Sequence, residues 1–170
     1  MPRLKASRPY MPGYGLADAK GGSGLLPWRW AKERIEKGRT YFIATTDPGG
    51  KPHVMPIWGV WFAEAFFFST GSQSRKARNL ATNSQCSIAT EIDFTSRPKK
   101  GQIKDSVVLE GVAEVISDAR IRKRFSSIYE DKYAWDMEDF SEPIYRVRPR
   151  VVFGLTSEFT QTATRWIFDQ

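Results

Sequence analysis

The chain has 170 residues, enough for one domain with its own core, and a hydrophobic content of 41% that excludes a disordered protein. Its net charge of +7, from 26 basic and 19 acidic residues, indicates an anionic partner: a phosphorylated cofactor, a nucleic acid or a membrane surface. A single cysteine excludes an internal disulfide framework, and a single histidine removes most metal sites and Ser-His-Asp designs, so we expect no bound metal.

No apolar run approaches the roughly 20 residues that cross a bilayer, and the first residues lack the apolar segment of a signal peptide. We therefore expect a cytoplasmic protein without an integral membrane segment. The lone Cys86 lies in an apolar run, which is typical of a small core residue and not of a nucleophile.

Residues 1–27 are predicted to form an N-terminal arm. Four prolines and five glycines exclude regular structure over most of it. Tyr10, Met11 and Tyr14 make it too apolar for a plain linker, so part of it should pack on the body or on a neighbouring subunit. A disordered tail is the simplest expectation before Arg8. Residues 28–170 are then a single domain.

After the arm, the pattern predicts a helix over residues 28–37 and a hairpin of two strands, 40–46 and 52–62. The second strand is apolar on both faces, so it is either packed against another subunit or has a flat ligand on one face. Pro56 marks an edge, a bulge or interrupted pairing, and Gly59 allows a close approach to the backbone.

A third strand over residues 65–70 leads into a helix over 74–82, whose first turn carries Arg75, Lys76 and Arg78. A helix start already bears partial positive charge, and no acidic residue lies between Glu64 and Glu91 to offset the basic side chains. A bound anion would remove this conflict, because free N–H groups at helix starts bind phosphate. The local pattern is equally compatible with a solvated basic face.

The rest of the chain predicts mainly strands. We expect a basic loop over residues 94–104, a bulge or a barrel corner at Gly111, and a helix over 119–129 that continues irregularly to 142. Strands are expected over residues 85–92, 106–116, 144–147, 151–159 and 164–168. Many short strands with three helices favour an antiparallel barrel over a doubly wound parallel sheet. Neither a G-x-G-x-x-G fingerprint nor a P-loop is present.

Residues 41–62, then 66–80 and a late segment over 151–154, resemble the pyridoxamine 5'-phosphate oxidase-like split-barrel proteins. The likeness is strongest to their flavin/deazaflavin oxidoreductase branch, which has similar segments to residues 8–15, 25–28 and 163–166. It covers nearly the whole chain. Its most specific piece is Ser69-Thr70 followed by residues 74–80.

This resemblance implies a mainly β fold, an antiparallel split barrel of Greek-key type with a few peripheral helices, and a homodimer with a cofactor in each of two clefts at the subunit interface. It implies that the ring system of the cofactor lies beside the strand over residues 55–60 and that its phosphate lies at the start of the helix over residues 74–82. C-terminal residues of the partner chain would close the cleft. In that order, the implied cofactor-binding residues are Met55, Pro56, Ile57 and Trp58; Ser69, Thr70, Gly71, Ser74, Arg75 and Lys76; and Arg165 and Trp166.

Both FMN and coenzyme F-420, a deazaflavin with a polyanionic tail, are used in the family that the chain resembles. The excess of positive charge favours F-420, because a tail would suit residues such as Lys99 and Lys100. The expected activity is hydride transfer between this cofactor and a small organic substrate, with no catalytic side chain of the protein, because the cofactor carries the chemistry.

Two alternatives remain within the same fold: a pyridoxamine phosphate oxidase-like enzyme that uses FMN, whose C-terminal Arg-Leu-His-type segment is absent here, and a non-catalytic flavin- or deazaflavin-binding protein. We expect no nucleic-acid partner, because the basic residues are not interleaved with aromatic residues in a stacking platform.

Overall fold

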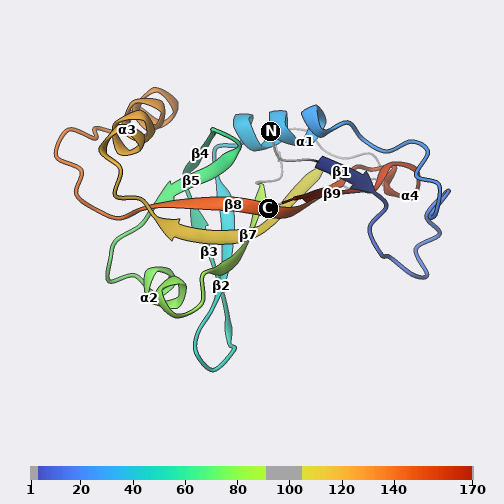
Figure 1. Cartoon of the computed structure of the whole chain (residues 1–170), viewed down its shortest axis with the longest axis horizontal. Helices are drawn as coiled ribbons and strands as arrows, with labels where there is room; N and C mark the ends of the chain where they lie inside the picture. Colours follow the sequence, from blue (N-terminus) through green and yellow to red (C-terminus); the bar gives the residue numbers. More distant parts are fainter. Residues whose placement is uncertain (1–3, 91–104, 170) are drawn as a thin grey trace.

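The computed structural model describes residues 4–90 and 105–169, which form a mainly antiparallel β fold with peripheral helices (Figure 1). The predicted basic loop over residues 94–104, with Lys99 and Lys100, lies outside the described residues, as does the predicted end of the strand at 91–92. The elements in chain order are β1 (Leu4–Ser7), α1 (Trp28–Lys37), β2 (Tyr41–Thr46), β3 (Pro52–Ile57), β4 (Gly59–Phe62), β5 (Ala65–Ser69), α2 (Arg75–Thr82), β6 (Gln85–Thr90), β7 (Ser106–Val115), α3 (Ala119–Tyr133), β8 (Ile144–Leu155), α4 (Phe159–Thr162) and β9 (Thr164–Phe168).

The strands close into a split barrel through one bent segment. The main path runs β1-β9-β8-β7-β6-β2-β3, and β5 pairs with both β8 and β4. The predicted single strand over residues 52–62 is two strands, because the chain leaves its pairing with β2 at Trp58 and joins β5 from Gly59 onward. β3 lies at the edge of the sheet, which is one of the three possibilities that Pro56 indicated.

β8 is one long strand and not the two short strands that the sequence predicted, since pairing with β7 continues past Pro149. The proline is tolerated because it lies opposite Gly111, where the predicted bulge shifts the register. On its other edge, β8 pairs with β5 up to Val147 and with β9 from Val151 onward. Residues 148–150 therefore face an opening in the barrel wall.

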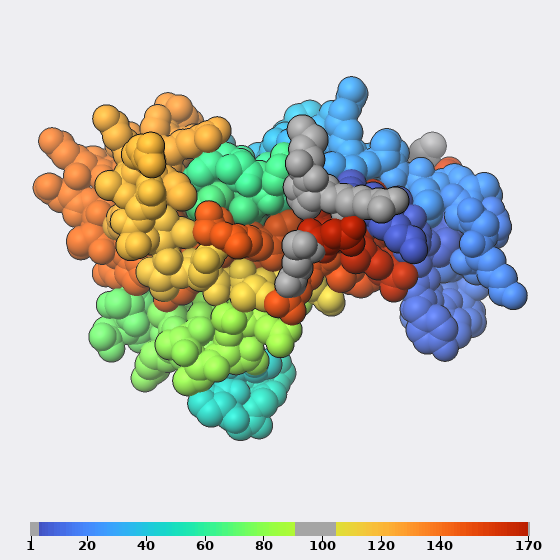
Figure 2. All heavy atoms as spheres, viewed as in Figure 1, coloured from blue at the N-terminus to red at the C-terminus, as the bar shows by residue number. Residues whose placement is uncertain are grey.

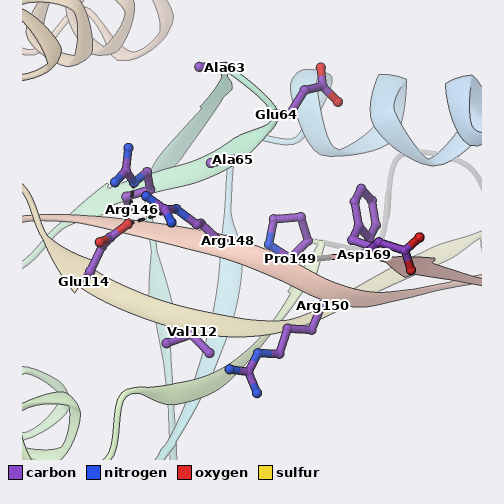
Figure 3. Close-up of a pocket in the computed structure, with 11 residues that line it drawn as sticks. Ala63, Glu64, Ala65, Val112, Glu114, Arg146, Arg148, Pro149, Arg150 and Asp169 are labelled. Carbon is purple, nitrogen blue, oxygen red and sulfur yellow. Dashed lines mark hydrogen bonds and ion pairs between the residues drawn. The ribbon is translucent and has the colours of Figure 1, made fainter. Parts of the chain in front are cut away.

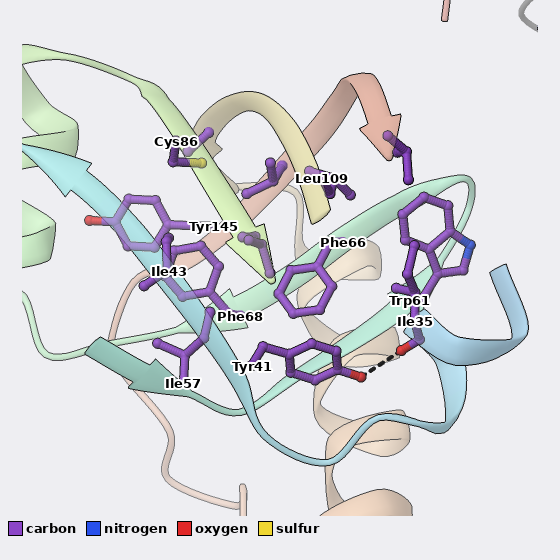
Figure 4. Close-up of a cluster of buried hydrophobic side chains, with 14 of the residues drawn as sticks. Ile35, Tyr41, Ile43, Ile57, Trp61, Phe66, Phe68, Cys86, Leu109 and Tyr145 are labelled. Carbon is purple, nitrogen blue, oxygen red and sulfur yellow. Dashed lines mark hydrogen bonds between the residues drawn. The ribbon is translucent and has the colours of Figure 1, made fainter. Parts of the chain in front are cut away.

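The barrel interior is filled with aromatic and branched side chains, among them Tyr41, Phe66, Phe68 and Leu109 (Figure 4). A second buried cluster lies outside the barrel, where Phe62 and Phe67 pack under Phe125 of α3. β4 is therefore buried on both faces, but α3 covers its outer face and no second subunit is needed there. Fully burying a side chain of this size contributes about 1.5–3 kcal/mol.

The arm is ordered against the C-terminal part of the chain. Residues 4–7 form a strand paired with β9, so the expected disordered tail is wrong for them. Tyr14 packs edge-on against Phe159 of α4, at 6.2 Å between ring centroids. Figure 2 shows the arm, in blue, as a lobe at one end of the molecule. α4 is a fourth helix that the sequence did not predict. α3 is regular as far as Tyr133, inside the segment for which the sequence predicted an irregular continuation.

Candidate functional site

The corner between β5 and α2 is held by hydroxyl groups. The Ser69 hydroxyl donates to the carbonyl of Pro143 at 2.7 Å, and Thr70 Oγ1 lies 3.1 Å from Ser74 Oγ. Ser74 caps α2, as predicted, because its Oγ accepts the N–H of Ala77 at 3.2 Å. The predicted phosphate-binding hydroxyls thus have fixed positions at a helix start.

A cavity of about 310 Å³ opens beside this corner. Six of its seven lining residues were predicted from the sequence. The seventh, Tyr129 of α3, was not predicted, because it lies 53 positions away from Lys76 along the chain and no local pattern marks it. The lining residues are Pro56, Ile57, Trp58, Ser69, Thr70, Lys76 and Tyr129. Strand, helix start and α3 therefore converge on one space.

Lys76 is the cation of this cavity. Partial burial lowers the pKa of its ammonium group below the usual value, because water solvates the charge less well there. Lys76 forms no ion pair with any residue that the structure describes. A bound anion would supply the missing opposite charge.

Arg75 points to a different partner. Its guanidinium lies 3.6 Å from the carboxylate of Asp47 in the β2–β3 turn, and the Ser72 N–H donates to Glu142 at 2.9 Å. No acidic residue is nearby along the chain, but Asp47 and Glu142 come close in space. They partly offset the positive charge at the helix start, and the charge of Lys76 is the part that they do not pair with.

Trp58 forms a wall of the cavity and is held by α3. Its ring stacks on Tyr133 with centroids 4.9 Å apart and 4° between planes, yet it remains 41% exposed. The Tyr133 hydroxyl accepts the N–H of Gly59 at 2.9 Å, and Lys132 Nζ donates to the Gly59 carbonyl at 2.9 Å. Helix α3 thus fixes the point at which the chain passes from β3 to β4.

The remaining predicted residues lie apart from this cavity. Met55 is exposed on β3, and Gly71 has open space around it. Trp166 is 1% exposed and packs against Trp28 at 5.7 Å, so its ring belongs to the core of its own chain and does not project to close a cleft. Arg165 points outward from β9 and donates to the Ser7 hydroxyl at 3.2 Å.

A larger cavity of about 490 Å³ lies at the opening beside β8 (Figure 3). Two of its three arginines share one carboxylate, since Glu114 lies 2.6 Å from Arg146 and 3.1 Å from Arg148. None of the predicted site residues lines it. We therefore take the smaller cavity beside α2 as the candidate site.

The outer face of the sheet links β3 to β9 in one row of cross-strand neighbours, which are Pro56, Phe42, Ala89, Val108, Phe153 and Arg165. Its middle members are apolar. Phe42 is 43% exposed, and the side chains of Ala89, Val108 and Phe153 are half-buried. One end of this row lines the candidate site, and the other end is Arg165.

Residues 4–90 and 105–169 contain neither a metal-binding cluster nor a membrane-spanning helix. No group of three or more His, Cys, Asp or Glu side chains there is arranged to hold a metal ion. No helix in that part of the chain is both long and apolar enough to cross a membrane.

Comparison with known proteins agrees with this architecture. A family model described as pyridoxamine 5'-phosphate oxidase matches residues 29–161. The heme storage protein HutZ of Vibrio cholerae is 22% identical, with a TM-score of 0.61 over 74% of this chain and 90% of that chain. A conserved hypothetical protein of Mycobacterium tuberculosis is 19% identical, with a TM-score of 0.67 over 79% and 88%.

An F-420 reductase is 20% identical, with a TM-score of 0.55 over 71% of this chain and 94% of that chain. These identities show a shared fold. No curated protein matches the chain at a significant level.

Proposed function

The chain belongs to the pyridoxamine 5'-phosphate oxidase family, and from this premise we propose that it is an oxidoreductase that holds F-420 or FMN in the cavity beside α2. The observation that carries the proposal is the convergence of Ser69, Thr70 and the uncompensated Lys76 with the exposed ring of Trp58 on one cavity. Hydroxyls and an ammonium group suit a phosphate, and an exposed indole suits a flat ring.

The residues present fit such a cofactor. Thr70 and Lys76 would hold the phosphate beside Ser69, whose hydroxyl is fixed by donating to the Pro143 carbonyl, while Pro56, Ile57 and Trp58 would lie along the ring. When bound, the cofactor supplies the hydride chemistry. The protein's part is to anchor the phosphate, orient the ring and keep water from one side of it.

Two residues of α3 support this role from behind. Tyr133 holds Trp58 by stacking, and Tyr129 lines the cavity from the same helix. Substrate is expected beside the ring, because the hydroxyl groups and Lys76 are assigned to the phosphate. No side chain of the protein is assigned an acid or base role.

We propose further that the protein is a homodimer that packs through the outer face of the sheet. A twofold axis parallel to the strands places β9 of one subunit over β3 of the other, because such a rotation exchanges the two edges of the sheet. Arg165 then approaches the cavity of the partner subunit. The exposed Phe42 and its half-buried neighbours are apolar, as an interface core requires.

The heme named for HutZ is a weaker candidate for this chain. Heme iron is most often held by a histidine or a thiolate. The only histidine, His53, and the only cysteine, Cys86, do not line the cavity, and Cys86 is buried in the barrel core.

The visible absorption spectrum of the purified protein, followed by titration with F-420, FMN and heme, tests the assignment. The double change Arg75→Ala and Lys76→Ala should weaken binding of F-420 or FMN by about tenfold or more, chiefly through the loss of Lys76, since one charge-assisted contact contributes roughly 1.5–3 kcal/mol. An unchanged affinity of the double variant for both cofactors would contradict the assignment of the phosphate site.

Turnover is a separate measurement. Oxidation of the reduced cofactor is followed with a panel of quinones, enones and dyes. Tight cofactor binding without turnover of any member of the panel would favour the non-catalytic binding protein.

A further inference from the structure

The N-terminal arm encloses a cavity of its own. It has a volume of about 440 Å³ and is lined by residues of the arm between Arg8 and Ala19, together with Arg165 of β9. It lies at the opposite end of the cross-strand row from the candidate cofactor site. The arm is thus a folded structure around a space.

Arg8 fixes the shape of this arm. Its side chain is 6% exposed and donates to the carbonyl oxygens of Ala163, at 2.8 Å, and of Ser23 and Gln161. Its Nε is buried and has no hydrogen-bond partner among the described residues. Asp18, the acidic residue closest to Arg8 in the arm, accepts the N–H groups of Gly21 and Ser23, both at 2.8 Å. Arg8 is therefore an anchor for the arm, and its charge is incompletely compensated.

Arg165 supplies an available cation to the same cavity. Its Nε and Nη2 both donate to the Ser7 hydroxyl at 3.2 Å, which is a neutral acceptor. It makes no ion pair with any residue in the described ranges 4–90 and 105–169. A guanidinium with free donors at the wall of a cavity matches a carboxylate or a phosphate group.

The backbone of the arm adds donors of the same kind. Gly13 and Gly15 have φ values of +81° and +66°, whereas Tyr14 between them keeps a negative φ. The Tyr14 N–H between them donates to the Met11 carbonyl at 3.4 Å, which closes a turn over Pro12 and Gly13 and leaves the N–H groups of the two glycines as the donors to consider here. Within the described chain, neither glycine N–H donates a hydrogen bond.

We propose that the arm cavity is an anion-binding site, in which Arg165 and the N–H groups of Gly13 and Gly15 receive a carboxylate or phosphate group. In the homodimer proposed above, Arg165 approaches the partner's cofactor site, so the anionic tail of F-420 is the expected source of that group. This identification of the source rests on the proposed function, whereas the site itself does not. The other source is a free phosphate or carboxylate.

The test uses the full chain and follows the Gly13 and Gly15 amide signals by NMR during titration with inorganic phosphate and with γ-glutamylglutamate. Wild type should show saturable shifts at both glycines. Arg165→Gln, which keeps a partner for Ser7, should weaken binding at least tenfold, and Arg165→Lys should restore part of it. Lys20→Gln removes one charge from the same arm outside the cavity and should leave the affinity within twofold.

The absence of saturable shifts in wild type, or equal affinities for wild type and Arg165→Gln, would overturn the site. Titration with F-420 and with FMN then assigns the source. Shifts of the Gly13 and Gly15 signals with F-420 but not with FMN would identify the F-420 tail as the bound anion. Shifts with phosphate alone would identify a free anion as the ligand and would overturn the assignment to the F-420 tail. Absorbance at the cofactor site is read in the same samples, so loss of cofactor binding is distinguished from failure of the arm site.

Discussion

The guanidinium of Arg75 lies 3.6 Å from the carboxylate of Asp47, whereas Lys76, the next residue, lines the candidate cofactor cavity and has no ion-pair partner in the described chain. Two neighbouring basic residues that look equivalent in the sequence therefore face different surroundings. One is held by the β2–β3 turn, and the other faces the space proposed for the phosphate.

This difference predicts unequal effects of single substitutions. Lys76→Ala should weaken binding of FMN or F-420 by about tenfold or more, because it removes a charge-assisted contact. Arg75→Ala should weaken it by less than about threefold, since its charge is already shared with Asp47. Absorbance titration of both variants with the cofactor measures the two affinities. A larger loss of affinity for Arg75→Ala than for Lys76→Ala would contradict the assignment of Lys76 to the phosphate.

The passage from β3 to β4 requires glycine at position 59. A Cβ at Gly59 would lie 2.2 Å from the Phe66 ring and 2.8 Å from the Phe67 carbonyl, and a backbone atom cannot swing aside. Gly59→Ala should lower the free energy of unfolding by roughly 2 kcal/mol. Gly71→Ala is the control, because nothing lies within 4 Å of a Cβ there, and its change should stay within about 0.5 kcal/mol. Urea unfolding curves measure both, and equal losses would show that the junction is not tightly packed.

The lowered pKa of Lys132 predicts that the free energy of unfolding rises with pH. Burial lowers the pKa of its ammonium group from 10.5 to about 8, so above pH 8 the folded chain holds fewer protons than the unfolded chain. The free energy of unfolding contributed by this group therefore rises between about pH 8 and pH 10.5. Lys132→Met removes the titrating group. Urea unfolding over this range should show wild type gaining stability relative to the variant, and a difference that stays flat or falls would refute the prediction.

The proposed dimer face gives a further test. Phe42→Glu places a charge in the middle of the exposed apolar row and should yield a monomer in size-exclusion chromatography with light scattering. Val115→Glu is a matched control, since Val115 is 61% exposed but lies at the end of β7 and outside that row. Dimers in both variants would place the interface elsewhere.

Most helices and strands were predicted correctly, because helix starts, caps and strand breaks are encoded by residues close together in the sequence. The helix over residues 28–37, the capping role of Ser74 and the bulge at Gly111 all follow from residues within one or two turns of the chain. The predicted break between residues 147 and 151 is wrong, because Pro149 is tolerated in β8 opposite Gly111, which is distant in sequence.

The candidate site was predictable only in part, for the same reason. Pro56 to Trp58, Ser69, Thr70 and Lys76 carry signals in their own segments, and the structure brings them together. Tyr129 and the pairing of Arg75 with Asp47 depend on how α3 and the β2–β3 turn fold back over the barrel. No short-range pattern contains that information.

Pro149 has a further consequence at the opening in the barrel wall. Along residues 148–150, β8 lacks a strand on one edge, between the end of its pairing with β5 and the start of its pairing with β9. An unpaired edge is a template on which another chain can add a strand. Proline has no N–H to offer, and Arg148 and Arg150 on either side are charged and exposed. The sequence thus protects the gap in its own barrel against edge-to-edge aggregation.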